Sequence, residues 1–257
     1  MPEFCQVERE GRVLRVTINR PEVMNALHPP ANFELEKVFD DFAADPELWV
    51  AILTGAGERA FSAGNDLKFQ ASAGGRLEIP RTGFAGLTSR FGNPKPVIAA
   101  VNGVAMGGGF EIALACDLVV AAESAVFALP EPRVGLAALA GGIHRLPRQI
   151  GLKHAMGMLL TGRRVSAREG QALGFVNEVV PASELLPAAR RWAAAILECA
   201  PLSVRATKEA ALAGLDRPLP EAMSAHTEGL ARMLRSEDFL EGPRAFAEKR
   251  PPQWKGR

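Results

Sequence analysis

The chain has 257 residues, of which 47% are hydrophobic and 23% are charged, and its formal net charge is +1. This composition predicts a globular protein with a sizeable core, and because no basic block is present, neither nucleic acids nor membrane surfaces are expected as partners. The three cysteines show neither a zinc-binding spacing nor a disulfide framework, which favours a reducing, cytoplasmic location and predicts no metal site.

Periodicity and turn residues divide the first part of the chain into short strands and helices. In chain order, the predicted elements are strands over 5–9 and 13–19 joined by a turn at Gly11, a helix over 31–43, a strand over 49–54, a loop over 71–83 that is the expected mobile lid, and a short helix over 84–91.

The most apolar stretch, 97–122, is long enough to span a bilayer, but it contains the carboxylates Glu111 and Asp117, which are costly there. It therefore predicts buried strands and a core helix. The remaining predicted elements are strands over 97–101, 118–121, 125–129 and 176–180, and helices over 108–115, 182–200, 202–213, 220–234 and 237–249. Strands and helices alternate early and helices finish the chain, which predicts an α/β fold with a helical C-terminal region and a boundary near residue 190.

Residues 103–117, GVAMGGGFEIALACD, place three glycines before a single carboxylate, Glu111, at the start of an apolar helix. The glycine spacing departs from the dinucleotide-binding and phosphate-loop patterns, so no nucleotide site of either kind is expected. Glycines at a helix start let the backbone approach a ligand, and the helix dipole there favours a developing oxyanion. The alternative is that Glu111 only complements the helix dipole.

Two further segments follow predicted strands. In FSAGND, over 61–66, the simplest interpretation is that Asn65 or Asp66 caps a short helix from Leu67. In ALPEPRVGL, Glu131 stands between two prolines, which predicts a rigid, non-helical backbone. A surface carboxylate is the alternative for Glu131.

Together these segments resemble the crotonase family, the enoyl-CoA hydratases and isomerases. The resemblance extends along nearly the whole chain and rests on NAL (25–27), FSAGNDL, KPVIAAVNGVAMGGGFEIALACD, FALPEPRVGL, AGGIHRL, TGR (161–163) and AFAEKR. It implies a crotonase-like spiral of ββα units over 1–190 that carries a CoA-thioester site, and a helical trimerisation region over 191–257. It also implies a homotrimer, or a hexamer built from two trimers.

The resemblance assigns roles to four residues. The backbone N–H groups of Asn65 and Gly108 would form an oxyanion hole for the thioester carbonyl. Glu111 would orient and deprotonate water, and Glu131 would donate a proton. Because both glutamates are present, hydration is favoured over double-bond isomerisation, which many relatives carry out with one carboxylate. Asn65 replaces the alanine common in hydratases, and its side chain is a candidate for the acyl-pocket lining.

The resemblance also implies where CoA binds. The implied contacts are Met24, Asn25, Ala63 and Lys68, with Phe246, Lys249 and Arg250 coming from a neighbouring subunit. No separate cofactor is implied, because CoA is part of the acyl-CoA substrate. Similarity is greatest to the carnitinyl-CoA dehydratase branch, which handles a quaternary ammonium acyl group. A general enoyl-CoA hydratase is the preferred interpretation, and the alternatives are carnitinyl-CoA specificity, an isomerase, and a catalytically silent CoA-thioester binding scaffold.

Overall fold

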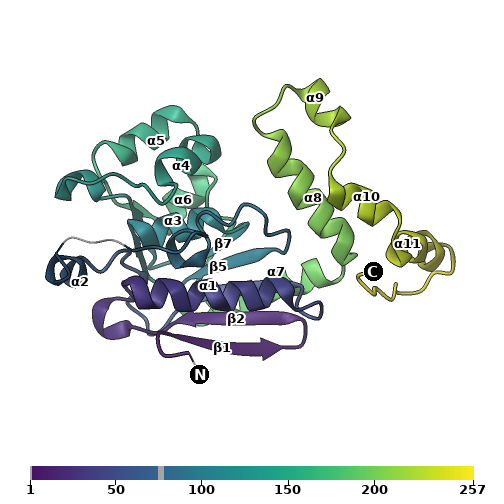
Figure 1. Ribbon diagram of the computed structural model, residues 1–257, viewed down its shortest axis with the longest axis horizontal. Helices are drawn as coiled ribbons and strands as arrows, with labels where there is room; N and C mark the ends of the chain where they lie inside the picture. The colour runs from purple at the N-terminus through teal and green to yellow at the C-terminus, as the bar shows by residue number, and fades with distance from the viewer. Residues whose placement is uncertain (1, 75–77) are drawn as a thin grey trace.

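The computed structural model describes residues 2–74 and 78–257 and contains two sheets surrounded by helices (Figure 1). Within these residues, six strands form the larger sheet, in the order β1-β2-β3-β5-β7-β10. They are β1 (Cys5–Glu10), β2 (Val13–Ile18), β3 (Val50–Gly55), β5 (Val97–Val101), β7 (Leu118–Ala122) and β10 (Glu178–Val180). β1 and β2 form the antiparallel hairpin, and every other neighbouring pair is parallel.

A smaller sheet has the order β4-β6-β8-β9 in the described part of the chain. Its strands are β4 (Ala60–Ser62), β6 (Val104–Met106), β8 (Val126–Ala128) and β9 (Val165–Ser166). The chain passes from the larger sheet to the smaller one three times, from β3 to β4, from β5 to β6 and from β7 to β8. Because β4, β6 and β8 are also mutually parallel, each pass repeats the one before, and the predicted spiral of ββα units is present.

The helices of the spiral pack around these sheets. They are α1 (Pro29–Ala44), α2 (Leu67–Ser72), α3 (Gly108–Ala115), α4 (Gly142–Ile150), α5 (Leu152–Leu159), α6 (Ala167–Leu173) and α7 (Leu185–Leu197), with 3-10 turns η1 (Pro21–Val23), η2 (Phe84–Gly86), η3 (Glu131–Val134) and η4 (Ala182–Glu184). Side chains along β3 alternate between two cores, as a strand buried on both faces requires. Ala51 and Leu53 belong to the core shared with α1 and α3, and Val50 and Ile52 to the core beneath α7.

The C-terminal helices project from the spiral at the right of Figure 1. They are α8 (Pro201–Gly214), α9 (Leu219–Ser224), α10 (Glu228–Leu234) and α11 (Glu237–Ala247). Large apolar side chains stand exposed on them, namely Leu212, Leu215, Leu219, Met223, Leu240 and Phe246. The predicted boundary at residue 190 falls inside α7, which packs on the larger sheet.

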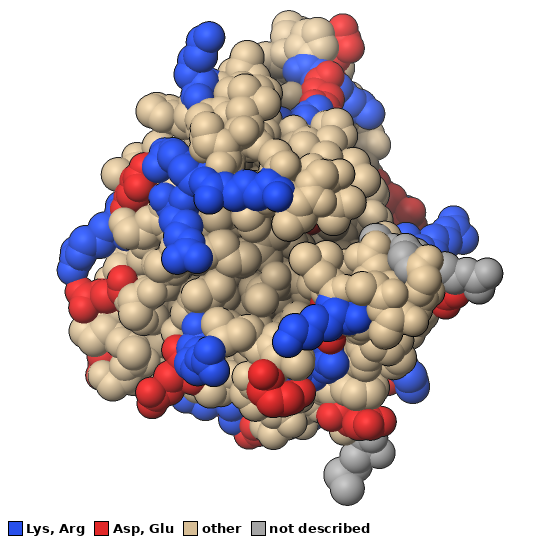
Figure 2. Space-filling view, turned by 90° about the vertical axis from the view of Figure 1, so that its left-hand side faces the viewer, with Lys and Arg blue, Asp and Glu red and all other residues tan. Residues whose placement is uncertain are grey.

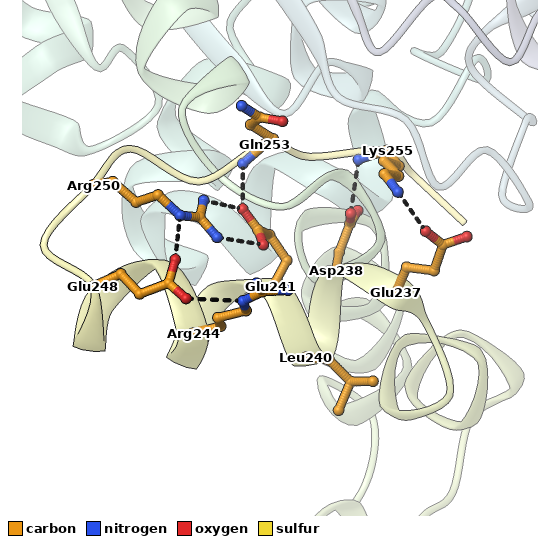
Figure 3. A pocket seen from close by; sticks show the side chains of 9 residues that line it. All are labelled: Glu237, Asp238, Leu240, Glu241, Arg244, Glu248, Arg250, Gln253 and Lys255. Atoms are coloured by element: carbon orange, nitrogen blue, oxygen red, sulfur yellow. Dashed lines mark hydrogen bonds and ion pairs between the residues drawn. The ribbon is translucent and has the colours of Figure 1, made fainter.

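The C-terminal tail folds back on α11 around a cavity of about 460 Å³ (Figure 3). Arg250 donates to both carboxylate oxygens of Glu241, at 2.6 and 3.0 Å. Asp238 accepts from the backbone N–H groups of Lys255 and Gly256, at 2.7 and 2.8 Å. The cavity is therefore lined by charges that already pair with one another, and it lies far from α3 (Figure 1).

Three predicted elements differ from the structure. The helix predicted over 220–234 is two helices, because Ala225 has extended backbone and Thr227 caps α10 through a bond from the Leu230 N–H to its hydroxyl. The helix predicted over 84–91 is a single 3-10 turn that includes a residue with positive φ, Ala85. The loop predicted over 71–83 begins inside α2, and its residues 75–77 lie outside the described residues.

The backbone around Glu131 was also predicted wrongly. It is not non-helical, because Glu131 begins the 3-10 turn η3, with Pro132 as its second residue. Proline is tolerated in the first turn of a helix, where its missing N–H has no intrahelical acceptor. In the described part of the chain, no helix is long and apolar enough to cross a membrane.

Candidate active site

Three adjacent parallel strands of the smaller sheet lead into the candidate site. Asn65 follows β4, Gly108 follows β6, and Glu131 follows β8. The carboxyl ends of parallel strands meet at one edge of a sheet, which is where ligands bind in many α/β proteins. The topology thus brings together three segments that are up to 66 residues apart in the chain, counting from Asn65 to Glu131.

The three glycines before Glu111 each meet a separate steric demand. Gly107 has φ of 53°, a conformation that side-chain-bearing residues rarely adopt. A Cβ atom on Gly108 would lie 2.6 Å from the ring of Phe84, and one on Gly109 would lie 2.0 Å from the Ser62 carbonyl oxygen. The start of α3 can therefore press against β4 and η2 only because these residues have no side chain.

At this edge of the sheet, two backbone N–H groups point away from the hydrogen bonds that hold the neighbouring backbone together. Leu27 bonds to the Gly64 carbonyl and to the Asp66 N–H, at 2.7 and 3.0 Å, so the Asn65 N–H between them points the opposite way. Gly108 is the first residue of α3, and no earlier turn supplies an acceptor for its N–H. A Cβ atom on Gly64 would stand 2.7 Å from the Gly108 nitrogen, which shows how closely the two segments approach.

The side chain of Asn65 makes a contact that the sequence did not indicate. Its amide donates to Oε1 of Gln70 at 2.5 Å, within the first turns of α2. Asp66 caps that helix, as one of the two predicted candidates, by accepting from the Phe69 N–H at 3.1 Å. These bonds hold the Asn65 backbone in place at the end of β4.

Glu111 is buried, with 3% of its surface exposed. Its Oε1 accepts from the Gly142 N–H at the start of α4, at 2.8 Å. Burial raises the pKa of Glu111 from the ordinary value of 4.5 to about 7, and the negative charge of Glu131 adds to this rise. The Gly142 N–H and the Arg145 charge oppose it. A carboxyl with this pKa can take up and release a proton near neutral pH.

Glu131 lies beside the same helix start. A Cβ atom on Gly107 would be 2.9 Å from its Oε1. Its Oε2 is buried and has no hydrogen-bond partner within the described residues. Burial also raises the pKa of the Glu131 carboxyl. The site therefore holds a buried carboxyl, Glu111, and a half-buried one, Glu131, whose charge acts on Glu111 and whose Oε2 has no partner among the described residues.

The predicted CoA contacts Met24 and Asn25 lie in one tight turn after η1, and the third contact, Ala63, follows β4 and hydrogen-bonds to that turn. Met24 and Asn25 have φ of 58° and 55°, and the Met24 carbonyl accepts from the Ala63 N–H at 2.9 Å. The Asn25 side chain is fully buried and donates to the Ala56 and Ala60 carbonyls. These bonds stabilise the turn from its buried side.

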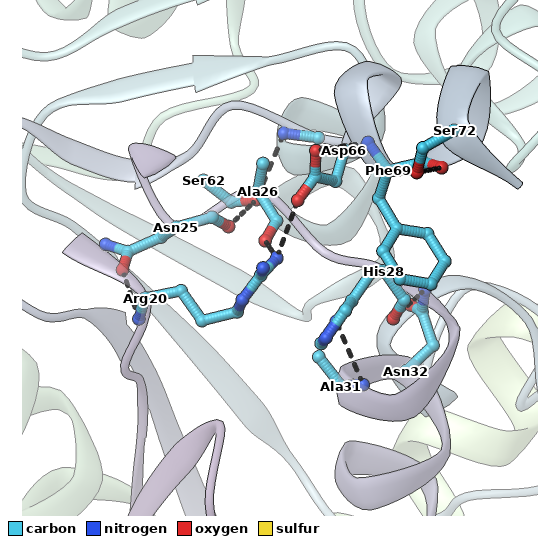
Figure 4. Close-up of polar contacts among 11 residues, drawn as sticks. Arg20, Asn25, Ala26, His28, Ala31, Asn32, Ser62, Asp66, Phe69 and Ser72 are labelled. Carbon is cyan, nitrogen blue, oxygen red and sulfur yellow. Dashed lines mark hydrogen bonds and ion pairs between the residues drawn. The ribbon is translucent and has the colours of Figure 1, made fainter. Parts of the chain in front are cut away.

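An ion pair that was not predicted from the sequence connects this turn to the end of β4. Arg20 pairs with Asp66 at 3.1 Å, and both side chains are largely buried (Figure 4). Arg20 also donates to the Ala26 carbonyl. No local pattern marks Arg20, because its partner lies 46 residues away.

The remaining predicted contacts are not together within one chain. Lys68 is exposed on α2, at the left of Figure 1, whereas Phe246 and Lys249 are exposed at the end of α11, at the right. The α2 side of the molecule carries Lys and Arg side chains around a central area with few charged groups (Figure 2). Among the described residues, no group of three His, Cys, Asp or Glu side chains is placed to hold a metal ion.

Comparisons with known proteins identify the family of this chain. The sequence profile of the family described as enoyl-CoA hydratase/isomerase matches residues 8–257. The chain belongs to this family. Carnitinyl-CoA dehydratases from Salmonella paratyphi A and Salmonella typhi are 47% identical to it over 264 aligned residues, with all of each chain covered. The family predicted from the sequence is therefore confirmed.

Solved structures support the same assignment for this enoyl-CoA hydratase/isomerase family member. The enoyl-CoA hydratase from Mycobacterium marinum is 41% identical, with all of both chains covered and a TM-score of 0.93. The enoyl-CoA hydratase from Bacillus anthracis is 37% identical, with 99% of this chain and all of that chain covered and a TM-score of 0.92. The predicted crotonase-like fold is thus confirmed.

The raised pKa of Glu111 leads to a prediction about stability. Between pH 4.5 and about 7 the native protein holds a proton that the unfolded chain has released, so its stability falls as pH rises through this window. Because the side chain of Glu111→Gln cannot ionise, this variant does not lose stability in that pH window. We expect its free energy of unfolding, relative to wild type, to improve by roughly 1–3 kcal/mol between pH 5 and pH 8, measured by urea denaturation. A difference that is the same at both pH values would contradict the raised pKa.

Proposed function

We propose that the protein is a hydro-lyase that reversibly adds water to the 2,3 double bond of an acyl-CoA thioester. The observation that carries this proposal is the meeting of two outward backbone N–H groups, the buried carboxyl of Glu111 and the half-buried carboxyl of Glu131 at the ends of β4, β6 and β8. The family relationship supports the same reaction class.

In the proposed mechanism, the N–H groups of Asn65 and Gly108 hold the thioester oxygen, where negative charge develops as water adds to C3. Losing one such donor typically costs about 2.7–4 kcal/mol of transition-state stabilisation. Glu111, ionised, takes a proton from the attacking water. Glu131, protonated for this step, gives its proton to C2, and burial raises its pKa in the direction that favours this form. The two carboxyls exchange their roles when the reaction runs in reverse.

CoA binding is assigned to the turn of Met24 and Asn25, to Ala63, which hydrogen-bonds to that turn, and to Lys68. We propose that Phe246 and Lys249 complete this site in a neighbouring subunit, because they lie too far from α2 to do so in their own. The exposed apolar side chains of α8 to α11 support residues 191–257 as the region of assembly into a trimer or a hexamer. The absence of a separate cofactor and a cytoplasmic location are part of the same proposal.

The subunit arrangement leads to a prediction about Lys249. Lys249→Gln should raise the KM for an acyl-CoA substrate roughly threefold to tenfold with little change in kcat, because an ammonium near the CoA phosphates contributes to binding alone. The effect should shrink at 0.5 M salt, where surface charges are screened. Lys37→Gln, an exposed lysine on α1, is the matched control. An unchanged KM would remove Lys249 from the CoA site.

The acyl group is tested by comparing kcat/KM for hydration of crotonyl-CoA and crotonobetainyl-CoA. A clear preference for crotonyl-CoA establishes a general enoyl-CoA hydratase. Preference for crotonobetainyl-CoA establishes the specificity named for the 47% identical relatives. Product analysis separates hydration from double-bond isomerisation. If neither substrate reacts, the hydro-lyase assignment is wrong, and a silent CoA-thioester binding protein becomes the better account.

A further inference from the structure

The segment around η2 lies against the oxyanion-hole glycine. The ring of Phe84 occupies the space in which a Gly108 side chain would stand, so it supports the backbone of Gly108 from behind. The Phe84 N–H donates to the Thr88 hydroxyl at 2.8 Å, and the Ala85 N–H donates to Oδ1 of the buried Asn32 at 2.7 Å. Phe84 is thus held by bonds on both sides.

The same segment is held in a strained backbone conformation. Ala85 has φ of 55°, which is uncommon for a residue with a side chain, and Gly83 and Gly86 also have positive φ. A Cβ atom on Gly86 would lie 2.4 Å from the Cα of Glu36 in α1. Such a conformation persists only where surrounding contacts over-determine it, and strain of this kind clusters at functional sites.

One of those contacts comes from the helix that also binds Glu111. Arg145, in the first half of α4, donates from Nη2 to the Thr88 carbonyl at 2.8 Å, and its guanidinium lies 5.7 Å from the ring centre of Phe91. A Cβ atom on Gly141 would be 2.1 Å from Nη1 of Arg145, so the Arg145 side chain folds back over the start of α4. Gly142, the next residue, supplies the N–H that Glu111 accepts.

Arg145 also acts on Glu111 electrostatically. The charges of Glu131 in η3 and Arg145 in α4 act on the pKa of Glu111. The pKa of Arg145 is in turn affected by Glu111 and by the thiol of Cys116 at the end of α3. Arg145 opposes the rise in the pKa of Glu111, whereas Glu131 increases it. Arg145 is therefore a cation whose charge favours the ionised form of this carboxyl.

We propose that Arg145 is a positioning residue that couples the two halves of the site. Its charge favours the Glu111 carboxylate, and its bond to Thr88 fixes Phe84 and thereby the backbone of Gly108. The inference rests on the proposed hydration reaction, and it adds a residue that touches neither the thioester nor water. No local pattern in the sequence indicates it, because Thr88 and Arg145 are 57 residues apart.

The test compares Arg145→Met, Arg145→Lys and Thr88→Val with the matched control Arg148→Met. Arg148 is on the same helix, 55% exposed, and pairs weakly with Asp216 at 3.5 Å. Two quantities are measured for each variant. The first is the pH dependence of kcat and KM for hydration, and the second is the titration of the Glu111 carboxyl by difference infrared spectroscopy, assigned with Glu111→Gln.

Arg145→Met should move the Glu111 midpoint upward by at least roughly half a pH unit and lower kcat at pH 7 about tenfold or more, with little change in KM. Arg145→Lys should keep the midpoint near wild type and lose kcat only about threefold, because an ammonium replaces the charge but not the planar fork. Thr88→Val removes only the acceptor for Phe84, so kcat should fall with the midpoint unchanged. Arg148→Met should match wild type.

A folded Arg145→Met protein with either the wild-type Glu111 midpoint or the wild-type kcat overturns the proposal, as does an equal loss of kcat in Arg148→Met. If Arg145→Met does not fold, wild-type kcat in both Arg145→Lys and Thr88→Val overturns it instead. The infrared titration needs no substrate. A wild-type protein without hydration activity therefore refutes the proposed function, whereas an unmoved midpoint in Arg145→Met refutes this inference.

Discussion

Glu111→Gln is expected to lower kcat for hydration by roughly two to four orders of magnitude, which is the usual contribution of a general base. The substitution preserves the size of the side chain, and the amide oxygen can still accept from the Gly142 N–H that holds Oε1 at 2.8 Å. What it removes is the ability to take a proton from water. Binding of an acyl-CoA should therefore remain within about threefold of wild type, because the proposed CoA contacts do not involve Glu111.

Single-turnover kinetics and a direct binding measurement with crotonyl-CoA separate these two effects. Glu47→Gln, which neutralises an exposed carboxylate in the turn between α1 and β3, is the control and should be indistinguishable from wild type. Turnover at the wild-type rate in Glu111→Gln would end the assignment of Glu111 as the base. Loss of binding together with loss of rate would show instead that the substitution disturbs the start of α3.

Gly109→Ala is expected to cost about 3 kcal/mol of stability, at the upper end of the usual range for overpacking, because contact with a backbone atom leaves the structure few ways to relax. The added Cβ would lie 2.0 Å from the Ser62 carbonyl oxygen, so α3 must move away from β4. That movement separates the Gly108 N–H from the Asn65 N–H. Hydration should fall by at least roughly a hundredfold even in the folded protein, which is the usual loss for one oxyanion donor.

Gly157→Ala is the matched control for this substitution. Gly157 lies inside α5, is exposed, and has open space where its Cβ would stand. Alanine there should be neutral or stabilising by about 0.5–1 kcal/mol, since glycine is a poor helix former. Thermal unfolding and kcat for crotonyl-CoA measure both variants. Equal stability of the two variants would contradict the close contact between α3 and β4.

Local patterns in the sequence predicted much of the fold. The hairpin, the helix after it, the strands β3, β5 and β7, and α3 all carry a period or an apolar run long enough to recognise. The strands β4 and β6, with three residues each, were missed because such segments are too short to show a period. The break between α9 and α10 was missed because Thr227 lies within a run that otherwise continues a helical pattern.

For the site, the sequence by itself determined the family to which the chain belongs, and it pointed to the residues that we propose carry the chemistry: the glycines before Glu111, Glu111 itself and the Glu131 between prolines. Tertiary structure alone decided their environment. The pKa of Glu111, the position of Gly108 against Phe84 and the coupling of Arg145 to Thr88 all arise between segments that are far apart in the chain. The reason is physical: spacing and residue type are local properties, whereas burial, close packing and electrostatic fields depend on which segments the fold brings together.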